Sequence, residues 1–233
     1  MAEKLSEEIL AELRAASCAG DWSTLVALLP EQPLTDVLQT VGDTVADAAA
    51  SGVPGAAELA EQCMLLLGER GWEGDEDLAE ELEAALGRSP VTMLRPLGVD
   101  LDELSGLLEG DPLWGGGRID LATGACWPEP ADVDVDEGGD GDDGGDRWLP
   151  VRREGARDGY RDMEWFITTV DDADLAARLE IAIVGRGAFG RFKDVLARSA
   201  AERSRYHRFA EERQRGRARA WLAARGYRPA ARR

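Results

Sequence analysis

Histidine and cysteine are scarce in this chain of 233 residues. His207 is the only histidine, and the three cysteines, Cys18, Cys63 and Cys126, stand far apart in the sequence. Structural zinc sites normally draw on four Cys or His ligands, and no Cys-x-x-Cys pair occurs. A Cys126–His207 pair is the one nucleophile–base hypothesis left, and no motif surrounds either residue. The sequence therefore predicts no metal site, no cofactor and no catalytic residues, with Cys18 and Cys63 buried and inert.

Long apolar runs are also missing. No stretch approaches the roughly 18–20 apolar residues that a membrane-spanning helix needs. Residues 1–8 contain neither the basic segment nor the apolar segment of a secretion signal. These absences predict a cytoplasmic protein that has no membrane partner.

Charge is divided unevenly along the chain. Residues 1–185 contain 12 Lys or Arg against 42 Asp or Glu, whereas residues 186–233 contain 15 against 4. The two balances, −30 and +11, add up to the net charge of −19. A basic segment at the end of an acidic chain predicts an anionic partner for that segment.

Apolar stripes at helical spacing predict helices in the first 110 residues. The stripes begin at Leu5, Leu34, Leu59 and Leu78, and breaks that contain glycine or proline separate them. A short helical array would show a fixed sequence period, and none is found. An irregular bundle is therefore preferred, with the array as the alternative. Further apolar stripes over residues 158–224 predict four more helices.

Caps and strands are also expected at definite positions. Asp21 and Asp75 stand where helix N-caps are expected. Residues 118–121 and 125–127 resemble a hairpin, and residues 148–152 resemble a third strand that Pro150 confines to an edge or a strand start.

The predicted fold is α+β and predominantly helical. We expect an all-α domain over residues 1–110, then an α+β domain over 111–225 with a small β-hairpin or three-stranded sheet. A disordered acidic loop over 129–146 interrupts the second domain, and a basic tail over 226–233 follows it.

The acidic loop contains nine acids in eighteen residues and no base, so it repels itself and has little to bury. Asp132, Asp134 and Asp136 have the spacing of calcium ligands, but Glu137 stands where the sharp turn of an EF-hand needs glycine. Asp143 also replaces the usual bidentate glutamate. A solvated linker is therefore preferred over a calcium site. A third hypothesis is that the loop folds back on the basic C-terminal region and competes with an anionic partner.

The stretch Gly185–Leu196 combines glycines, aromatic residues and positive charges. The two glycines, Gly185 and Gly187, fit neither a complete Rossmann fingerprint nor a P-loop. They favour a tight corner between two helices. The alternative is an anion site at the start of the second helix, beside Arg186 and Arg191.

The last predicted helix, residues 200–224, is rich in arginine, with Tyr206, Phe209 and Trp221 between the arginines. Arginines with aromatic residues are typical of surfaces that follow a nucleic-acid backbone and stack bases. A solvated basic face, partly neutralised by the acidic remainder of the chain, is the preferred interpretation of this helix. The residues predicted to bind an anion are Arg186, Gly187, Arg191, Lys193, Arg205, Arg208 and Arg215.

From about residue 99 to residue 225 the chain resembles a bacterial protein family of unknown function. The resemblance is carried by Asp100–Leu104, by Ile119–Gly124, by Tyr160-x-x-Met163-Glu164-x-Phe166-Ile167, by Gly185-Arg186-Gly187-Ala188-Phe189-x-Arg191-Phe192-Lys193-Asp194-Val195-Leu196, and by Tyr206-x-x-Phe209, Arg213 and Trp221-Leu222. Gly190 stands where the family usually has arginine, and Tyr206 stands where it usually has tryptophan. The resemblance implies no reaction.

The motif residues expected to form the core are Tyr160, Met163, Phe166, Phe189, Phe192, Leu196, Phe209 and Trp221. The first functional hypothesis is a non-enzymatic binding or regulatory protein whose basic C-terminal helices engage nucleic acid or an acidic protein surface. The second is an enzyme or small-ligand binder with a pocket near Tyr160, Glu164 and residues 187–193. The third is a helical protein–protein interaction module that uses the N-terminal helices.

Overall fold

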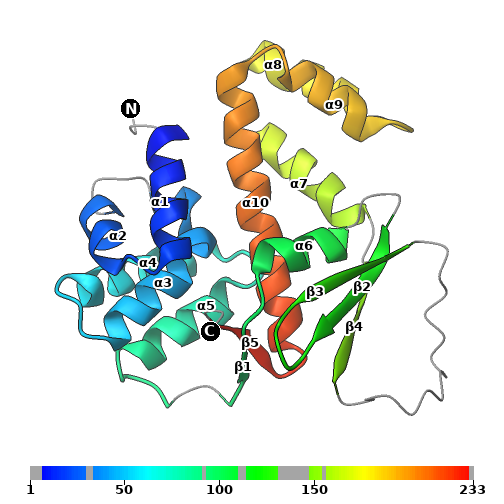
Figure 1. The fold of residues 1–233 in the computed structure, drawn as a ribbon. Coiled ribbons are helices and arrows are strands. Elements are labelled where there is room, and N and C mark those ends of the chain that lie inside the picture. The colour runs from blue at the N-terminus through cyan, green and yellow to red at the C-terminus, as the bar shows by residue number, and fades with distance from the viewer. Residues whose placement is uncertain are drawn as a thin grey trace, which may run out of the picture.

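The computed structural model describes residues 7–29, 34–90, 93–109, 114–130, 147–153 and 156–230. Helices dominate and two small sheets complete the fold, which confirms the predicted α+β, predominantly helical class. In Figure 1 the long helix α10 (Ala200–Ala223) runs through the middle of the molecule. The N-terminal helices lie on one side of it, and the helices of residues 157–196 and the three-stranded sheet lie on the other.

The described N-terminal part is helical, as predicted. Its elements are α1 (Glu7–Ala19), α2 (Trp22–Leu28), the 3₁₀ turn η2 (Leu34–Asp36), α3 (Leu38–Ala50), α4 (Ala56–Arg70) and α5 (Asp75–Ala85). The N-cap at Asp21 is confirmed, because its carboxylate accepts hydrogen bonds from the Thr24 backbone N–H at 3.2 Å and hydroxyl at 2.7 Å. The predicted cap at Asp75 is wrong. Gly74 occupies the cap position in the left-handed conformation. The Asp75 carboxylate instead accepts a hydrogen bond from the Arg70 guanidinium at 2.7 Å, in a buried ion pair.

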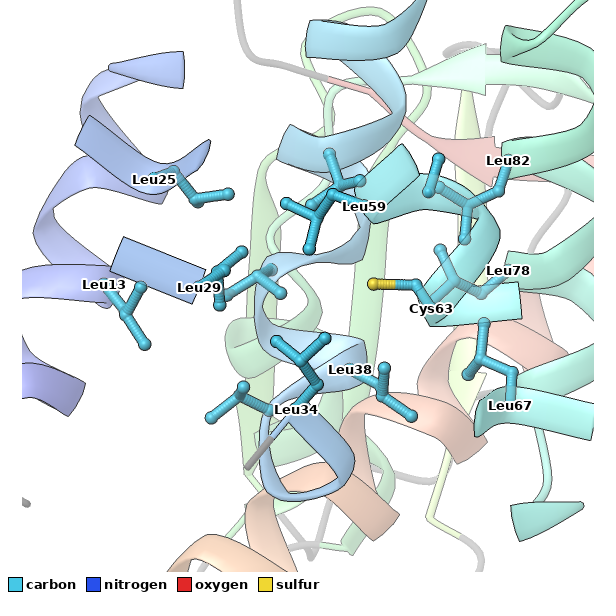
Figure 2. Packing of buried hydrophobic residues seen from close by; sticks show 14 of the residues in the cluster. Leu13, Leu25, Leu29, Leu34, Leu38, Leu59, Cys63, Leu67, Leu78 and Leu82 are labelled. Carbon is cyan, nitrogen blue, oxygen red and sulfur yellow. The ribbon is translucent and has the colours of Figure 1, made fainter. Parts of the chain in front are cut away.

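Leucines from all five of these helices form one core, here called the N-terminal cluster. Figure 2 shows Leu25 and Leu29 pointing toward Leu59, with Cys63 among the leucines. Each leucine buried in such a core contributes about 1.5–3 kcal/mol of transfer free energy. Burial, with the nearby negative charge of Glu212, raises the pKa of the Cys63 thiol to about 12. The prediction of a buried, inert thiol is confirmed at Cys63, and the side chain of Cys18 lies outside the described residues.

The antiparallel sheet has three strands. Of the two predicted alternatives, a β-hairpin or a three-stranded sheet, the second is confirmed. They are β2 (Trp114–Asp120), β3 (Cys126–Pro130) and β4 (Trp148–Arg152), in the order β3-β2-β4. Pro150 lies in edge strand β4, where its missing N–H costs no ladder hydrogen bond. Because β3 reaches Pro130, the first two residues of the predicted acidic loop belong to a strand. Residues 131–146, with the candidate calcium ligands Asp132, Asp134, Asp136 and Asp143, lie outside the described residues.

A second, two-stranded sheet was not predicted. β1 (Arg95–Leu97) pairs in parallel with β5 (Tyr227–Pro229), which the sequence analysis assigns to a basic tail. Next to this sheet, α6 (Leu101–Glu109) packs against β2 and α10. Leu104, Ile119 and Leu222 are among the residues of the resulting core, here called the sheet cluster. Residues 101–109 therefore pack with elements that the sequence analysis assigns to the second domain.

The helices α7 (Arg157–Thr168), α8 (Ala173–Ala182) and α9 (Ala188–Leu196) form the third core together with α10. Four rings meet in this aromatic cluster. The ring centroid of Phe166 lies 6.4 Å from that of Phe192, 5.1 Å from that of Tyr206 and 5.8 Å from that of Phe209. These edge-on and tilted contacts are the arrangements that aromatic quadrupoles favour.

The N-terminus of α3 is capped by a residue of α10. Val37 occupies the cap position and has no side-chain acceptor. The Glu212 carboxylate accepts hydrogen bonds from the backbone N–H groups of Gln39 at 2.8 Å and Thr40 at 2.9 Å, and from the Thr40 hydroxyl at 2.7 Å. Arg70 completes the set with an ion pair at 3.0 Å. A carboxylate there satisfies free N–H groups and meets the positive end of the helix dipole, so α10 joins the two sides of the molecule.

Two glycines let α10 approach the turn before α5 closely. A Cβ atom built on Gly216 would lie 2.2 Å from the Glu73 carbonyl oxygen, and one built on Gly74 would lie 2.1 Å from the Gly216 carbonyl oxygen. Within a helix, alanine is normally more stable than glycine by roughly 0.5–1 kcal/mol. At Gly216 the backbone contact reverses that preference.

We therefore expect Gly216→Ala to lower the free energy of unfolding by about 1–3 kcal/mol, the usual range for overpacking. Gly190→Ala is the matched control, because Gly190 is also helical and a Cβ there would meet nothing within 4 Å. It is expected to raise the free energy of unfolding by roughly 0.5–1 kcal/mol. Urea denaturation of both variants checks the pair, and a stabilised Gly216→Ala protein contradicts the close contact.

Candidate functional site

Most arginines of α10 point into the protein. Arg219 is 0% exposed. Its guanidinium donates to Asp43 at 2.8 Å, to Glu81 at 3.1 Å and to the side-chain oxygen of Gln39 at 2.9 Å. These partners belong to α3 and α5, so the positive charge of the C-terminal region neutralises acids of the N-terminal region.

Burial of this ion pair disfavours the charged form of Glu81. Burial raises the pKa of Glu81 from the usual 4.5 to about 7, although the charge of Arg219 lowers it in part. The folded protein therefore holds this proton more tightly than the unfolded chain does. The stability that Glu81 contributes is greatest below pH 4.5 and is lost as the pH rises to about 7.

A second group of arginines converges on Asp162 of α7, which is buried. Arg213 donates to one carboxylate oxygen at 2.9 Å, and Arg217 donates to the other at 2.8 Å. Arg217 also pairs with Glu109 of α6, which in addition accepts a hydrogen bond from Gln214 at 2.6 Å. Burial raises the pKa of Glu109 by more than Arg217 lowers it.

Three of the predicted anion-binding residues lie on α10. Arg205 donates to Glu202 at 2.8 Å and to the Thr169 hydroxyl at 2.8 Å. Arg215 pairs with Asp102, and Arg208 is buried. These side chains are engaged within the chain rather than gathered on an open basic face.

Gly185 and Gly187 form the predicted tight corner. Both have positive φ angles, +79° and +77°, and Gly187 is the N-cap of α9. Arg191 closes the corner from inside. It donates to the carbonyl oxygens of Ala182 at 3.0 Å and Val184 at 2.7 Å, and to that of Arg186. Because Ala182 is the last residue of α8, Arg191 caps the C-terminal end of that helix and also ties down the loop that follows it.

Four exposed cations in the described part of the C-terminal region have side chains that make no hydrogen bond or ion pair there, and they lie on or near α9 in the sequence. They are Arg186 before the helix, Lys193 within it, and Arg198 and Arg203 after it. Two apolar side chains are exposed just before them, Ile181 by 73% and Val184 by 72%. We call these six residues the α9 edge.

The predicted motif core is largely found in the interior. Met163, Phe166, Phe192, Leu196 and Trp221 are buried, while Tyr160 and Phe209 are half-buried against the aromatic cluster. Phe189 differs from the prediction. It is 37% exposed and lines a cavity instead of filling the core.

That cavity has a volume of about 730 Å³ and opens between α6, α7, α9 and α10. Gly159, Phe189 and Lys193 line one part of it, and Glu109 and Gln214 line another. The second functional hypothesis places a pocket near Tyr160 and Glu164. Tyr160 instead donates its hydroxyl to the Ile183 carbonyl at 3.1 Å, and Glu164 is exposed. The concave surface therefore lies beside the 187–193 segment, and its acid with a raised pKa is Glu109.

Metal-binding geometry is not found in the described ranges. No group of three or more His, Cys, Asp or Glu side chains there has an arrangement that could hold an ion. Cys126 lies in β3 and His207 on the exposed side of α10. Among the helices of the described part, none is both long and apolar enough to cross a membrane.

Comparison with known proteins bears on the C-terminal part alone. Neither the curated proteins nor the solved structures contain a match to this chain. The segments Asp100–Leu104 and Ile119–Gly124 lie outside the region that a family model matches. Residues 132–233, which include the corner at Gly185 and all of α10, match the model of the Uncharacterised protein family (UPF0158), so this part of the chain resembles a family of unknown function.

Proposed function

We propose that the protein is a non-enzymatic binding module that engages an acidic surface of a protein partner with its α9 edge. The observation that carries this proposal is the division of the C-terminal cations into two groups. The arginines of α10 that face inward already have carboxylate partners, whereas Arg186, Lys193, Arg198 and Arg203 do not have one among the described residues. Among the described cations of residues 186–230, those of the α9 edge are thus available to a partner.

The surroundings of these cations favour a protein partner over nucleic acid. Ile181 and Val184 are exposed beside Arg186, and apolar side chains next to arginine are typical of protein interfaces. A nucleic-acid surface would combine cations with exposed aromatic rings on which bases stack. Here Tyr206, Phe209 and Trp221 pack against the cores, and the partly exposed ring of Phe189 lines the cavity between α6, α7, α9 and α10.

The test compares two variants that change charge equally. The first is Arg186→Glu with Arg198→Glu and Arg203→Glu, which reverses the α9 edge and leaves Lys193 in place. The control is Arg95→Glu with Arg153→Glu and Arg157→Glu, three exposed arginines elsewhere in the described chain that have no side-chain partner there. Proteins captured from a lysate of the source organism are identified by mass spectrometry and then titrated as purified proteins against both variants.

We expect the edge variant to bind the captured partner at least about tenfold more weakly than wild type, a loss of about 1.4 kcal/mol, and the control to bind as wild type does. Equal binding by both variants would overturn the proposal. Titration with labelled duplex DNA and single-stranded RNA runs in parallel. Binding that weakens with salt and disappears only in the edge variant would replace the protein partner with nucleic acid.

A further inference from the structure

The cavity between α6, α7, α9 and α10 contains four carboxylates, and each of them already has a partner. The pairs are Asp102 with Arg215, Glu109 with Arg217 and Gln214, Asp162 with Arg213 and Arg217, and Glu211 with Arg14. The acids that line the cavity therefore contribute little net negative charge. A cation entering the cavity would meet carboxylates whose charge is already balanced.

The polar groups left over in the cavity are donors. Neither the Lys193 ammonium nor the His207 imidazole has a hydrogen bond or ion pair with the described residues, and both side chains are exposed. The Tyr206 hydroxyl also has no hydrogen-bond partner among those residues. Burial, together with the negative charges of Asp162 and Glu109, raises the pKa of Tyr206, so its hydroxyl keeps its proton and can donate it.

The cavity extends along α10 from His207 to Gln214, which is about 10 Å at 1.5 Å per residue. Phe189 provides an apolar wall near the Lys193 end. Its ring lies against Gly159, where an added Cβ atom would be 3.2 Å from the ring. The far end offers the Gln214 amide and the Glu109 carboxylate. A volume of about 730 Å³ is within the range of sites for small molecules.

We infer that this cavity binds a small organic anion, with its carboxylate or phosphate group held by Lys193, His207 and Tyr206 and its polar body lying along α10 toward Gln214. The uncompensated charge of the cavity carries the inference, since Lys193 is the one charged side chain of its lining without a partner among the described residues. This site is separate from the proposed binding of a protein to the α9 edge, although Lys193 lies on both.

The single histidine provides a direct measurement on the intact protein. The imidazole signals of His207 are recorded by ¹H–¹⁵N NMR while the full chain is titrated with glycerol 3-phosphate or with 3-hydroxybutyrate. Ionic strength is held constant with sodium chloride. We expect a saturable shift with a Kd below about 1 mM for one of the two anions, and which of them binds more tightly decides between phosphate and carboxylate.

Two variants of the proposed ligand-binding residues and one control test whether the anion binds in this cavity. Lys193→Met is expected to weaken binding at least tenfold, and Tyr206→Phe, which removes one donor, about three- to tenfold. Arg198→Met removes an exposed charge that follows α9 in the sequence and lies outside the cavity lining, and it is expected to bind as wild type does. Shifts that do not saturate with either anion, or an equal loss in Lys193→Met and Arg198→Met, would overturn the inference. The α9-edge variant keeps Lys193, so it is expected to bind the small anion even if it has lost the protein partner. Failure of this inference can therefore be told apart from failure of the proposed function.

Discussion

Replacement of Glu212 by alanine is expected to lower the free energy of unfolding by about 3–5 kcal/mol, the cost of removing one partner from a buried ion pair. Glu212 is 2% exposed, and its carboxylate serves Arg70 and the first turn of α3 together. Without it, Arg70 keeps only Asp75 as an ionic partner, and the N–H groups of Gln39 and Thr40 lose their acceptor. Water cannot replace that acceptor easily because the site is buried.

Urea denaturation with circular dichroism measures this effect. Glu211→Ala is the matched control, since the neighbouring carboxylate is 42% exposed and pairs with Arg14. An exposed pair contributes about 0–1 kcal/mol, so the control is expected to unfold near the wild-type midpoint. Equal losses in the two variants would show that Glu212 does not cap α3 in solution.

Arg219→Met is the second large effect. Methionine retains the apolar length of the side chain but leaves Glu81 and Asp43 without their cation. We expect a loss of about 3–5 kcal/mol at pH 8, where Glu81 is ionised. At pH 5.5 the loss should be smaller, because a protonated Glu81 needs no counterion. The sign follows from the raised pKa of Glu81, about 7 in the wild type and higher once Arg219 is removed.

The control for Arg219 is Arg203→Met, on the exposed N-terminal part of the same helix. It is expected to change stability by less than about 0.5 kcal/mol at both pH values. A loss in Arg219→Met that is the same at pH 5.5 and pH 8 would contradict the account of Glu81.

Helices and the antiparallel sheet could be predicted because their signals are local. The stripe that begins at Leu34 has the 3.6-residue period of α3, and Gly185 and Gly187 mark a corner that only glycine adopts without strain. β1 and β5 could not be predicted in this way. Each is three residues long, too short for any period, and their pairing joins Arg95 to Tyr227.

The burial and pairing of the α10 arginines could not be predicted from their spacing, since their partners are distant in the chain. Arg219 and Asp43 are 176 residues apart, and nothing local relates them. One signal was present in the sequence. Glu81 interrupts the apolar stripe of α5, which places a carboxylate where that helix is buried. Buried carboxylates need cations, and in an acidic chain with one basic segment that segment is the richest source of them.

The most direct test of the account is the solvent exchange of arginine side-chain protons. The Nε–H of Arg219 donates to Gln39 and that of Arg213 donates to Asp162, whereas Arg186, Arg198 and Arg203 are exposed. ¹⁵N NMR of the arginine Nε–H groups at neutral pH measures each exchange rate. We predict that Arg219 and Arg213 exchange at least about 100-fold more slowly than the three exposed arginines, which corresponds to about 2.7 kcal/mol of protection. Similar rates for all five would show that the α10 arginines face solvent and that the basic helix is free to bind a partner.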